Sequence, residues 1–337
     1  MSLHLFLEKT DILPKGAYVF TPKHSTPMLS DNIDAVYFPY MINGGFLTAQ
    51  MKTRLKKFIP QEYLDTRLEY EYVDGQVPKY LCNIYRKRLK KTHPSLQHKH
   101  IVFLHIADFP FPYDVDENMT IVRCSVDRST MHKRDIVMPS RVPYEDWWGP
   151  QKNITSSIGF CGCPHTHPTR KKLLQDLDAL QEIDFDSFYT SNFYNHTKYI
   201  VKHRHPNLSV AEREKIIQET RANLKEEFNQ RLQRNIFSLC PRGRGNYSVR
   251  FYESLRAGRI PVMIDTDQVF PLEDTIDWGD IVICAKTTEE LLQKVHDWTE
   301  NRDLIEVQKR CREVWETYLH FPHFVELLPD YIEKSMS

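Results

Sequence analysis

The part of the sequence best suited to chemistry is a short loop rich in glycine and arginine. Its members are Arg242, Gly243, Arg244 and Gly245. The apolar run before the loop predicts a buried strand, which Pro241 ends. A helix is expected to begin near Asn246 or Ser248, since either residue can act as an N-cap. Free amides and the positive end of the helix dipole would then point into the loop and, with the arginines, suit a diphosphate.

The expected helix carries a carboxylate that could hold a ribose. Apolar side chains at helical spacing predict the face that packs on a sheet: Tyr247, Phe251 and Leu255. Glu253 lies off this face, where it can accept paired hydrogen bonds from neighbouring ribose hydroxyls. The alternative is an ion pair of Glu253 with Arg250 or Arg256, which stabilises a helix by about a few tenths of a kcal/mol. The residues alone leave both interpretations open.

The composition is that of a globular protein with room for two domains. Of 337 residues, 41% are hydrophobic and 27% charged, which allows sizeable cores. Since 45 basic residues balance 45 acidic ones, the basic surplus typical of nucleic-acid binding is missing. The 7 scattered cysteines do not indicate a disulfide framework. We recognise neither a signal peptide nor a transmembrane segment, and expect a soluble, most simply cytoplasmic protein.

Short β-rich runs alternate with helical patterns on both sides of a cluster of proline, tryptophan and glycine at residues 135–150. This cluster predicts a linker. The alternation is typical of βαβ units, so we expect an α/β protein with two Rossmann-like domains facing a cleft. The expected parts are an N-terminal domain (1–150), a C-terminal domain (151–316) and a C-terminal helix (317–337) that packs back on the first domain.

The expected elements follow from hydrophobic periodicity and from turn residues. Strands are expected at residues 17–20, 35–38, 101–106, 119–125, 156–161, 186–189, 236–240, 260–265 and 280–284. Helices are expected at residues 46–58, 79–91, 169–180, 210–234, 246–257 and from 288 onward. Ser209 is the expected N-cap of the long charged helix, and Gly258 the expected C-cap of the helix after the glycine-rich loop.

Residues 237–265 resemble the signature of the exostosin family, glycosyltransferase family 47. That family shows a Cys-Pro-Arg-Gly-like turn, a Ser-x-Arg-Phe/Leu-Tyr-Glu-Ala helix and an Ala-Gly-x-Ile-Pro-Val strand. This chain has Cys-Pro-Arg-Gly at 240–243, Ser-Val-Arg-Phe-Tyr-Glu-Ser at 248–254 and Ala-Gly-Arg-Ile-Pro-Val at 257–262. A looser match at residues 158–162, followed by Arg170, extends the resemblance to residues 156–286.

The resemblance implies a GT-B glycosyltransferase that inverts configuration at the anomeric carbon. The donor would be a UDP-sugar, for example UDP-xylose or UDP-glucuronic acid, and the acceptor an oligosaccharide or glycan hydroxyl. Carried over by position, the donor-binding residues are Arg170, Arg242, Gly243, Asn246, Ser248, Arg250 and Glu253. Arg242 would also act in catalysis on the leaving diphosphate. The alternative is an inactive nucleotide-sugar-binding protein or the partner subunit of a heteromeric transferase.

An inverting transfer needs a general base for the acceptor hydroxyl. We take Asp108 as the candidate, because it follows an expected buried strand and loops at that end of a parallel strand bind ligands. The alternatives considered are Asp114, Asp116, Glu145 and Asp146. No Asp-x-Asp pair demands a metal at the diphosphate, so we expect no obligatory metal and leave metal dependence open.

Overall fold

The structure is a computed structural model. It describes residues 5–8, 18–22, 33–39, 100–106, 119–140, 142, 144–147, 149–180, 183–191 and 197–336. The chain forms two compact units. Unit 1 comprises Met1–Pro139, Asp267–Leu272 and Pro322–Ser337, and unit 2 comprises Ser140–Thr266 and Glu273–Phe321. The helices expected at 46–58 and 79–91 lie outside the described residues, as does Asp108.

Unit 1 contains a six-stranded sheet with the order β1-β2-β3-β4-β5-β6. The strands are β1 (Leu5–Glu8), β2 (Tyr18–Pro22), β3 (Ile33–Pro39), β4 (His100–Ile106), β5 (Met119–Arg123) and β6 (Asp135–Val137). Strands β3 to β6 are parallel, as expected. The pairs β1–β2 and β2–β3 are antiparallel, which differs from an all-parallel expectation. Short connections explain the difference, because a parallel crossover needs about a dozen residues or more.

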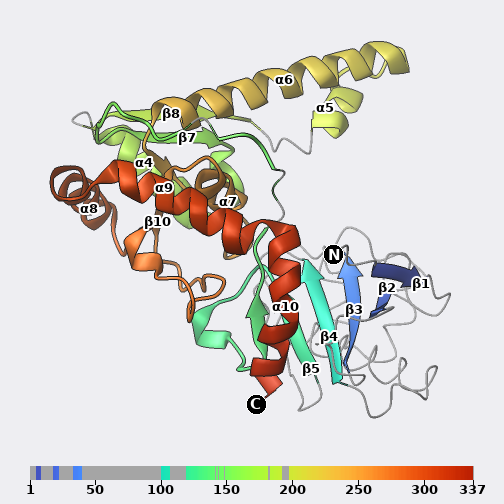
Figure 1. The fold of residues 1–337 in the computed structure, drawn as a ribbon. Helices are drawn as coiled ribbons and strands as arrows, with labels where there is room; N and C mark the ends of the chain where they lie inside the picture. The colour runs from blue at the N-terminus through green and yellow to red at the C-terminus, as the bar shows by residue number, and fades with distance from the viewer. Residues whose placement is uncertain are drawn as a thin grey trace. The chain divides into compact units, whose positions relative to one another are not determined.

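Two segments from late in the chain complete unit 1. Helix α10 (Phe321–Met336) is joined to β5 by a hydrogen bond of 3.1 Å between the Thr120 and Ser335 hydroxyls, and Figure 1 shows it beside that strand. The segment Asp267–Leu272 is held through Asp267, whose carbonyl accepts from the Arg128 amide at 2.7 Å. The Asp267 carboxylate also accepts from the Ser129 amide at 2.9 Å.

Unit 2 contains a five-stranded, wholly parallel sheet with the order β11-β10-β9-β7-β8. Its strands are β7 (Ile158–Gly162), β8 (Phe185–Tyr189), β9 (Phe237–Leu239), β10 (Ile260–Ile264) and β11 (Ile283–Ala285). The prediction of an α/β protein with parallel sheets is confirmed. From β7 the chain moves one way to β8, and from β9 it moves the other way to β10 and β11. The pair β7–β9 is therefore a topological switch point, where α/β sheets bind ligands at the carboxyl ends of the strands.

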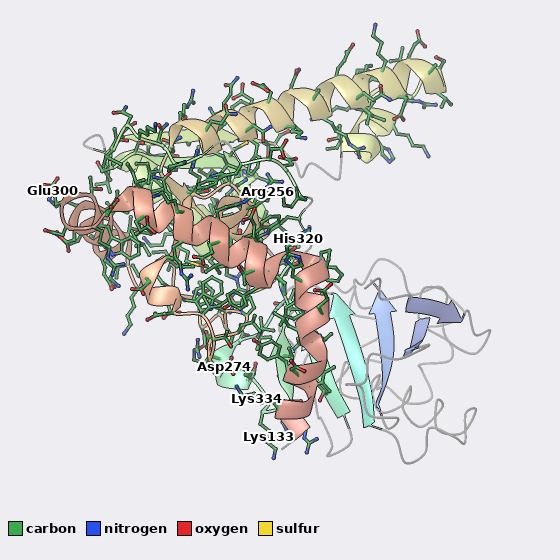
Figure 2. All side chains as sticks on the ribbon, viewed as in Figure 1. Lys133, Arg256, Asp274, Glu300, His320 and Lys334 are labelled. Carbon is green, nitrogen blue, oxygen red and sulfur yellow. The ribbon has the colours of Figure 1, made fainter. Side chains whose placement is uncertain are left out.

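Helices cover both faces of this sheet. They are α4 (Pro168–Ala179), α6 (Val210–Arg234), α7 (Val249–Arg256), α8 (Thr288–Asn301) and α9 (Leu304–Val314), while α5 (Thr197–Arg204) packs on α6. Helix α4 contacts α8, and α7 contacts α9, which gives two helical layers. Helix α6 packs on β7 at its C-terminal end and continues beyond the sheet with α5 (Figure 1). Figure 2 shows side chains standing out along this projecting part.

The ends of two helices are fixed by the residues that the sequence indicated. The Ser209 hydroxyl accepts from the Glu212 amide at 3.3 Å and the Glu212 carboxylate accepts from the Ser209 amide at 2.8 Å, so the predicted N-cap is confirmed as a capping box. After α7, Gly258 has a φ of +60°, as expected of a C-terminal glycine. A Cβ at Gly258 would lie 2.6 Å from Nε1 of Trp147, so a side chain does not fit.

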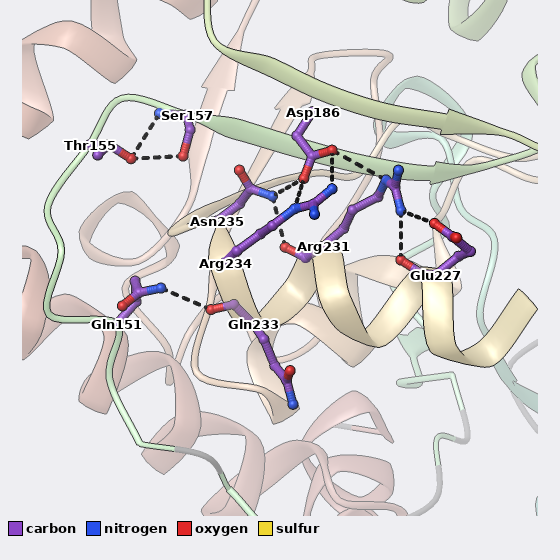
Figure 3. Close-up of polar contacts among 9 residues, drawn as sticks. All are labelled: Gln151, Thr155, Ser157, Asp186, Glu227, Arg231, Gln233, Arg234 and Asn235. Carbon is purple, nitrogen blue, oxygen red and sulfur yellow. Dashed lines mark hydrogen bonds and ion pairs between the residues drawn. The ribbon is translucent and has the colours of Figure 1, made fainter. Parts of the chain in front are cut away.

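A polar network at the amino ends of β7 and β8 anchors the C-terminal end of α6 (Figure 3). The Asp186 carboxylate accepts from Arg234 at 2.5 and 2.7 Å and from Nδ2 of Asn235 at 2.8 Å. A Cβ on the nearby Gly159 would lie 2.8 Å from Nδ2 of Asn235, so a side chain there would displace Asn235. Among the described helices, none is long and apolar enough to cross a membrane.

Candidate functional site

The loops that follow β7 and β9 leave neighbouring strands at the same edge of the sheet. Ile158 of β7 is paired with Phe237 of β9, so the two strands run in register towards this edge. The glycine-rich loop predicted from the sequence follows β9, and the segment 163–167 follows β7. We use the name switch-point crevice for these two loops together with the strand ends between them. It is the place where this topology favours ligand binding.

Arg170 joins the two loops. Its Nε donates to the Arg242 carbonyl at 2.8 Å and its Nη2 to the Pro241 carbonyl at 2.5 Å, both in the loop after β9. Its Nη1 donates to the Cys163 carbonyl at 3.2 Å, in the loop after β7. Burial, followed by the charge of Arg250, lowers the pKa of Arg170 to about 9, so the guanidinium stays charged at neutral pH.

The glycine-rich loop is anchored at both ends. The Gly243 amide donates to the Tyr247 carbonyl at 3.0 Å, and Nη2 of the half-buried Arg242 reaches the Arg244 carbonyl at 3.5 Å. The Asn246 side chain is buried and donates from Nδ2 to the Thr266 carbonyl at 2.7 Å. Asn246 therefore fastens the loop to the segment that follows β10.

Helix α7 begins at Val249, and Ser248 is its N-cap residue. Of the two caps considered from the sequence, Ser248 is thus the one observed. In this described segment the Ser248 side chain makes no capping hydrogen bond, although the residue is buried. The first amides of a helix have no acceptor within the helix, so this end offers donors to an anion.

Arg250 lies at the carboxyl end of β7. Its guanidinium carbon is 4.7 Å from the centroid of the Phe160 ring and 5.2 Å from that of Phe228. A Cβ on Gly162, the last residue of β7, would be 3.2 Å from its Nη2. In the described part of the chain, no hydrogen bond or ion pair engages the Arg250 side chain. The two rings hold this cation without neutralising it.

Glu253 is half-buried one turn after Arg250. No hydrogen bond or ion pair among the described residues engages its carboxylate, so the alternative pairing with Arg250 or Arg256 is not observed. Arg256 instead pairs with Glu145 at 3.1 Å. Burial raises the pKa of the Glu253 carboxyl, and the charges of Arg250 and Arg256 oppose this. A partly buried carboxylate of this kind can accept hydrogen bonds from the hydroxyl groups of a ligand.

His167 is a polar group of the crevice that the sequence analysis did not assign to the donor site. Its Nδ1 accepts from the Thr169 amide at 3.2 Å and caps α4, so Nε2 carries the proton of the neutral ring. Burial, followed by the charges of Arg242 and Arg170, lowers its pKa to about 4. The signal in the sequence was Pro168, a residue typical of the first position of a helix.

Residues 164–296, which include the crevice and α7, match the family model of the Exostosin GT47 domain. This part of the chain is an exostosin domain. It belongs to a glycosyltransferase family, as the resemblance of residues 237–265 implied.

Curated relatives are similar to this chain over part of their length. An Exostosin-1 homolog of Caenorhabditis elegans is 31% identical over 107 residues, which cover 32% of this chain and 27% of that protein. Exostosin-1 of Drosophila melanogaster is 34% identical over 121 residues, 32% of this chain and 16% of that protein. A probable β-1,4-xylosyltransferase of Arabidopsis thaliana, IRX10L, is 48% identical over 50 residues, 15% of this chain and 12% of that protein.

The chain thus spans 27% or less of these curated relatives. Among solved structures, TarM from S. aureus is similar with a TM-score of 0.36 and 11% identity, over 70% of this chain and 51% of that one.

All candidates for the general base precede the exostosin domain in the sequence. Asp108, Asp114 and Asp116 lie outside the described residues. Glu145 is held by Arg256 at 3.1 Å and by Lys225 at 3.2 Å. Within the described residues, no group of three histidine, cysteine, aspartate or glutamate side chains could hold a metal ion.

Proposed function

We propose that this chain is an inverting glycosyltransferase whose exostosin domain binds a UDP-sugar at the switch-point crevice. The observation that carries the proposal is the arrangement of Arg250 and Glu253. They lie one turn apart on α7 at the carboxyl edge of the sheet, and they are not paired with each other. A cation and a carboxylate held apart in this way suit a ligand with a phosphate group and neighbouring hydroxyls.

The diphosphate end of the donor would lie against Arg242, Arg250 and the first turn of α7 after Ser248. These groups supply positive charge and oriented donors where negative charge develops as UDP leaves. Nε2–H of His167, a neutral donor at neutral pH, lies on the other loop of the crevice. A metal ion is not required for this stabilisation, since the protein supplies the charge.

The ribose end would lie against Glu253. Its carboxylate can accept hydrogen bonds from both ribose hydroxyls. These hydrogen bonds would stabilise the charged carboxylate, which burial disfavours. The nucleotide would therefore lie along α7, with its phosphates at the start of the helix and its ribose about one turn further on.

In the proposed reaction an acceptor hydroxyl attacks the anomeric carbon and the bond from this carbon to the UDP oxygen breaks. A carboxylate takes the hydroxyl proton. Asp108 remains our candidate for this base, and we assign acceptor binding to unit 1. The relative named as a probable xylosyltransferase makes UDP-xylose the first donor to test, and UDP-glucuronic acid, the other donor that the resemblance implied, is the second.

The test exposes the purified protein to a panel of UDP- and GDP-sugars and to UDP alone, and measures thermal stability and donor hydrolysis together. We expect one UDP-sugar both to stabilise the protein and to be hydrolysed. Glu253→Gln should lose this response, and Glu214→Gln, a change on the exposed face of α6, should keep it. A wild-type protein that responds to no nucleotide would contradict the proposal. Binding without hydrolysis or transfer would favour a non-catalytic protein or a partner subunit.

A further inference from the structure

We propose that Arg170 is a positioning residue that fixes the glycine-rich loop, and that it is not itself a ligand of the phosphates. The resemblance made it a phosphate candidate, but its donors are directed at the backbone. The inference rests on the proposed function only for its effect on UDP binding. Its effect on the loop exists in the protein without ligand.

Within the described ranges, the guanidinium of Arg170 donates hydrogen bonds to backbone carbonyls only. Three of the five N–H groups of a guanidinium are bound here, to the carbonyls of Pro241, Arg242 and Cys163. The residue is 9% exposed. Among the described residues no carboxylate pairs with it, so these carbonyls hold the cation. Only two N–H groups remain for a phosphate, on a side chain that is almost fully buried.

Fixing two carbonyls fixes the amides that follow them. In a trans peptide the C=O and N–H groups point in opposite directions. When Arg170 binds the carbonyls of Pro241 and Arg242, the amides of Arg242 and Gly243 are turned away from it. The Gly243 amide accordingly donates to the Tyr247 carbonyl at 3.0 Å, directly before α7. Arg170 thereby sets the path of the loop into the helix that carries Arg250 and Glu253.

The third hydrogen bond gives Arg170 a role across the switch point. The Cys163 carbonyl belongs to the loop after β7, while Pro241 and Arg242 belong to the loop after β9. One side chain therefore ties the two walls of the crevice to the first turns of α4. A lysine has the same charge but a single nitrogen, so it cannot reproduce this planar fork.

The chain offers a matched control in Arg259. This arginine is also buried, at 2% exposure, and also binds backbone carbonyls, of Leu232 at 2.5 Å and of Gly149 at 3.2 Å. It precedes β10 and so lies at the amino end of the sheet, away from the crevice. Its loss should reduce stability without any effect on the glycine-rich loop.

The experiment compares Arg170→Lys with Arg259→Lys. Amide hydrogen exchange at Gly243 is measured by NMR without ligand, together with UDP affinity and the urea midpoint. We expect Arg170→Lys to speed Gly243 exchange by about tenfold or more and to weaken UDP binding by about tenfold. Arg259→Lys should lower the urea midpoint but change neither the Gly243 exchange rate nor the UDP affinity. Unchanged Gly243 exchange in Arg170→Lys, or UDP affinity retained by the lysine, would overturn the proposal.

A measurement on the wild-type protein covers the case in which Arg170→Lys does not fold. The Arg170 Nε–H, bound to the Arg242 carbonyl, should exchange slowly and keep its NMR signal position when UDP is added. A large shift would show direct contact with the ligand and would overturn the proposal. If the wild type binds no UDP, the proposed function fails, and Gly243 exchange still decides the role of Arg170.

Discussion

Asn246 and Thr266 exchange two hydrogen bonds. Nδ2 of Asn246 donates to the Thr266 carbonyl at 2.7 Å, and Oγ1 of Thr266 donates to Oδ1 of Asn246 at 2.7 Å. The glycine-rich loop is thus held by two residues far from it in the sequence, Arg170 on one side and Thr266 on the other. The shape of the crevice depends on both contacts.

The first prediction concerns this exchange. Asn246→Ala and Thr266→Val should each reduce the free energy of unfolding by about 1–3 kcal/mol, because each removes hydrogen bonding of the buried Asn246 side chain. The double variant should lose less free energy of unfolding than the sum of the two single losses, since both substitutions remove the same interaction. Urea unfolding measures this, with Thr275→Val at an exposed position as the control. Fully additive losses would show that the two residues act independently.

The second prediction separates Arg250 from Glu253 by the ligand that each contacts. Arg250→Gln should weaken UDP binding by about tenfold or more and leave uridine binding unchanged, because uridine has no phosphate. Glu253→Gln should weaken both ligands, because both contain the ribose. Isothermal titration calorimetry provides the affinities. Equal losses of UDP and uridine in Arg250→Gln would remove this arginine from the phosphate site.

The third prediction concerns stability and pH. Because burial raises the pKa of Glu253, the folded protein holds this proton more tightly than the unfolded chain. Stability should then fall as pH rises from about 4.3 through the folded pKa. Glu253→Gln should unfold at a higher urea concentration than the wild type at pH 7, and the gain should shrink towards pH 4. A less stable Glu253→Gln at pH 7 would refute this assignment.

The fourth prediction concerns His167, whose pKa is lowered to about 4. Its folded pKa lies below its ordinary value, so its contribution to stability is complete above about pH 6.5 and is lost as pH falls towards 4. NMR titration should find the ring neutral from about pH 5 to about pH 8, with the proton on Nε2. A ring that titrates near its ordinary pKa would contradict the buried, capping position.

The fifth prediction is a steric one. In Gly159→Ala the new methyl group would meet Nδ2 of Asn235, which Asp186 and the Arg231 carbonyl hold in place. We expect a loss of about 1–3 kcal/mol in the free energy of unfolding. UDP affinity should not change, since this contact is at the amino end of the sheet. A variant as stable as the wild type would show that the polar network of Figure 3 can shift.

Sequence patterns predicted the elements well where a residue with special chemistry marks an end. The long helix was expected at 210–234 and is observed as Val210–Arg234, because Ser209 and Glu212 form a capping box. The last strand was expected at 280–284 and is observed as Ile283–Ala285. The reason is a short helix, Trp278–Asp280, that Asp277 caps and that takes up the first expected strand residue. Local hydrophobicity did not reveal this cap.

The candidate site was predictable only where its members are close in the sequence. Arg250 and Glu253 share one helix, so their spacing already suggested a common site. Arg170 contacts a loop about seventy residues later in the chain, and no periodic pattern signals which carbonyls it binds. Asn246 was a candidate N-cap from its residue type, but its side chain instead donates a hydrogen bond to the Thr266 carbonyl. Such contacts depend on the strand order, which brings the loops together.

The path of the chain has a consequence for the order in which the protein is made. Unit 1 is built from three separate stretches, and the last of them, Pro322–Ser337, follows all of unit 2. On the ribosome, the exostosin domain therefore emerges and can fold before unit 1 has its final helix. A stop codon that removes Pro322–Ser337 should leave the exostosin domain intact, although most of unit 1 is made before it. Unit 1 should then lack its last helix and be incomplete.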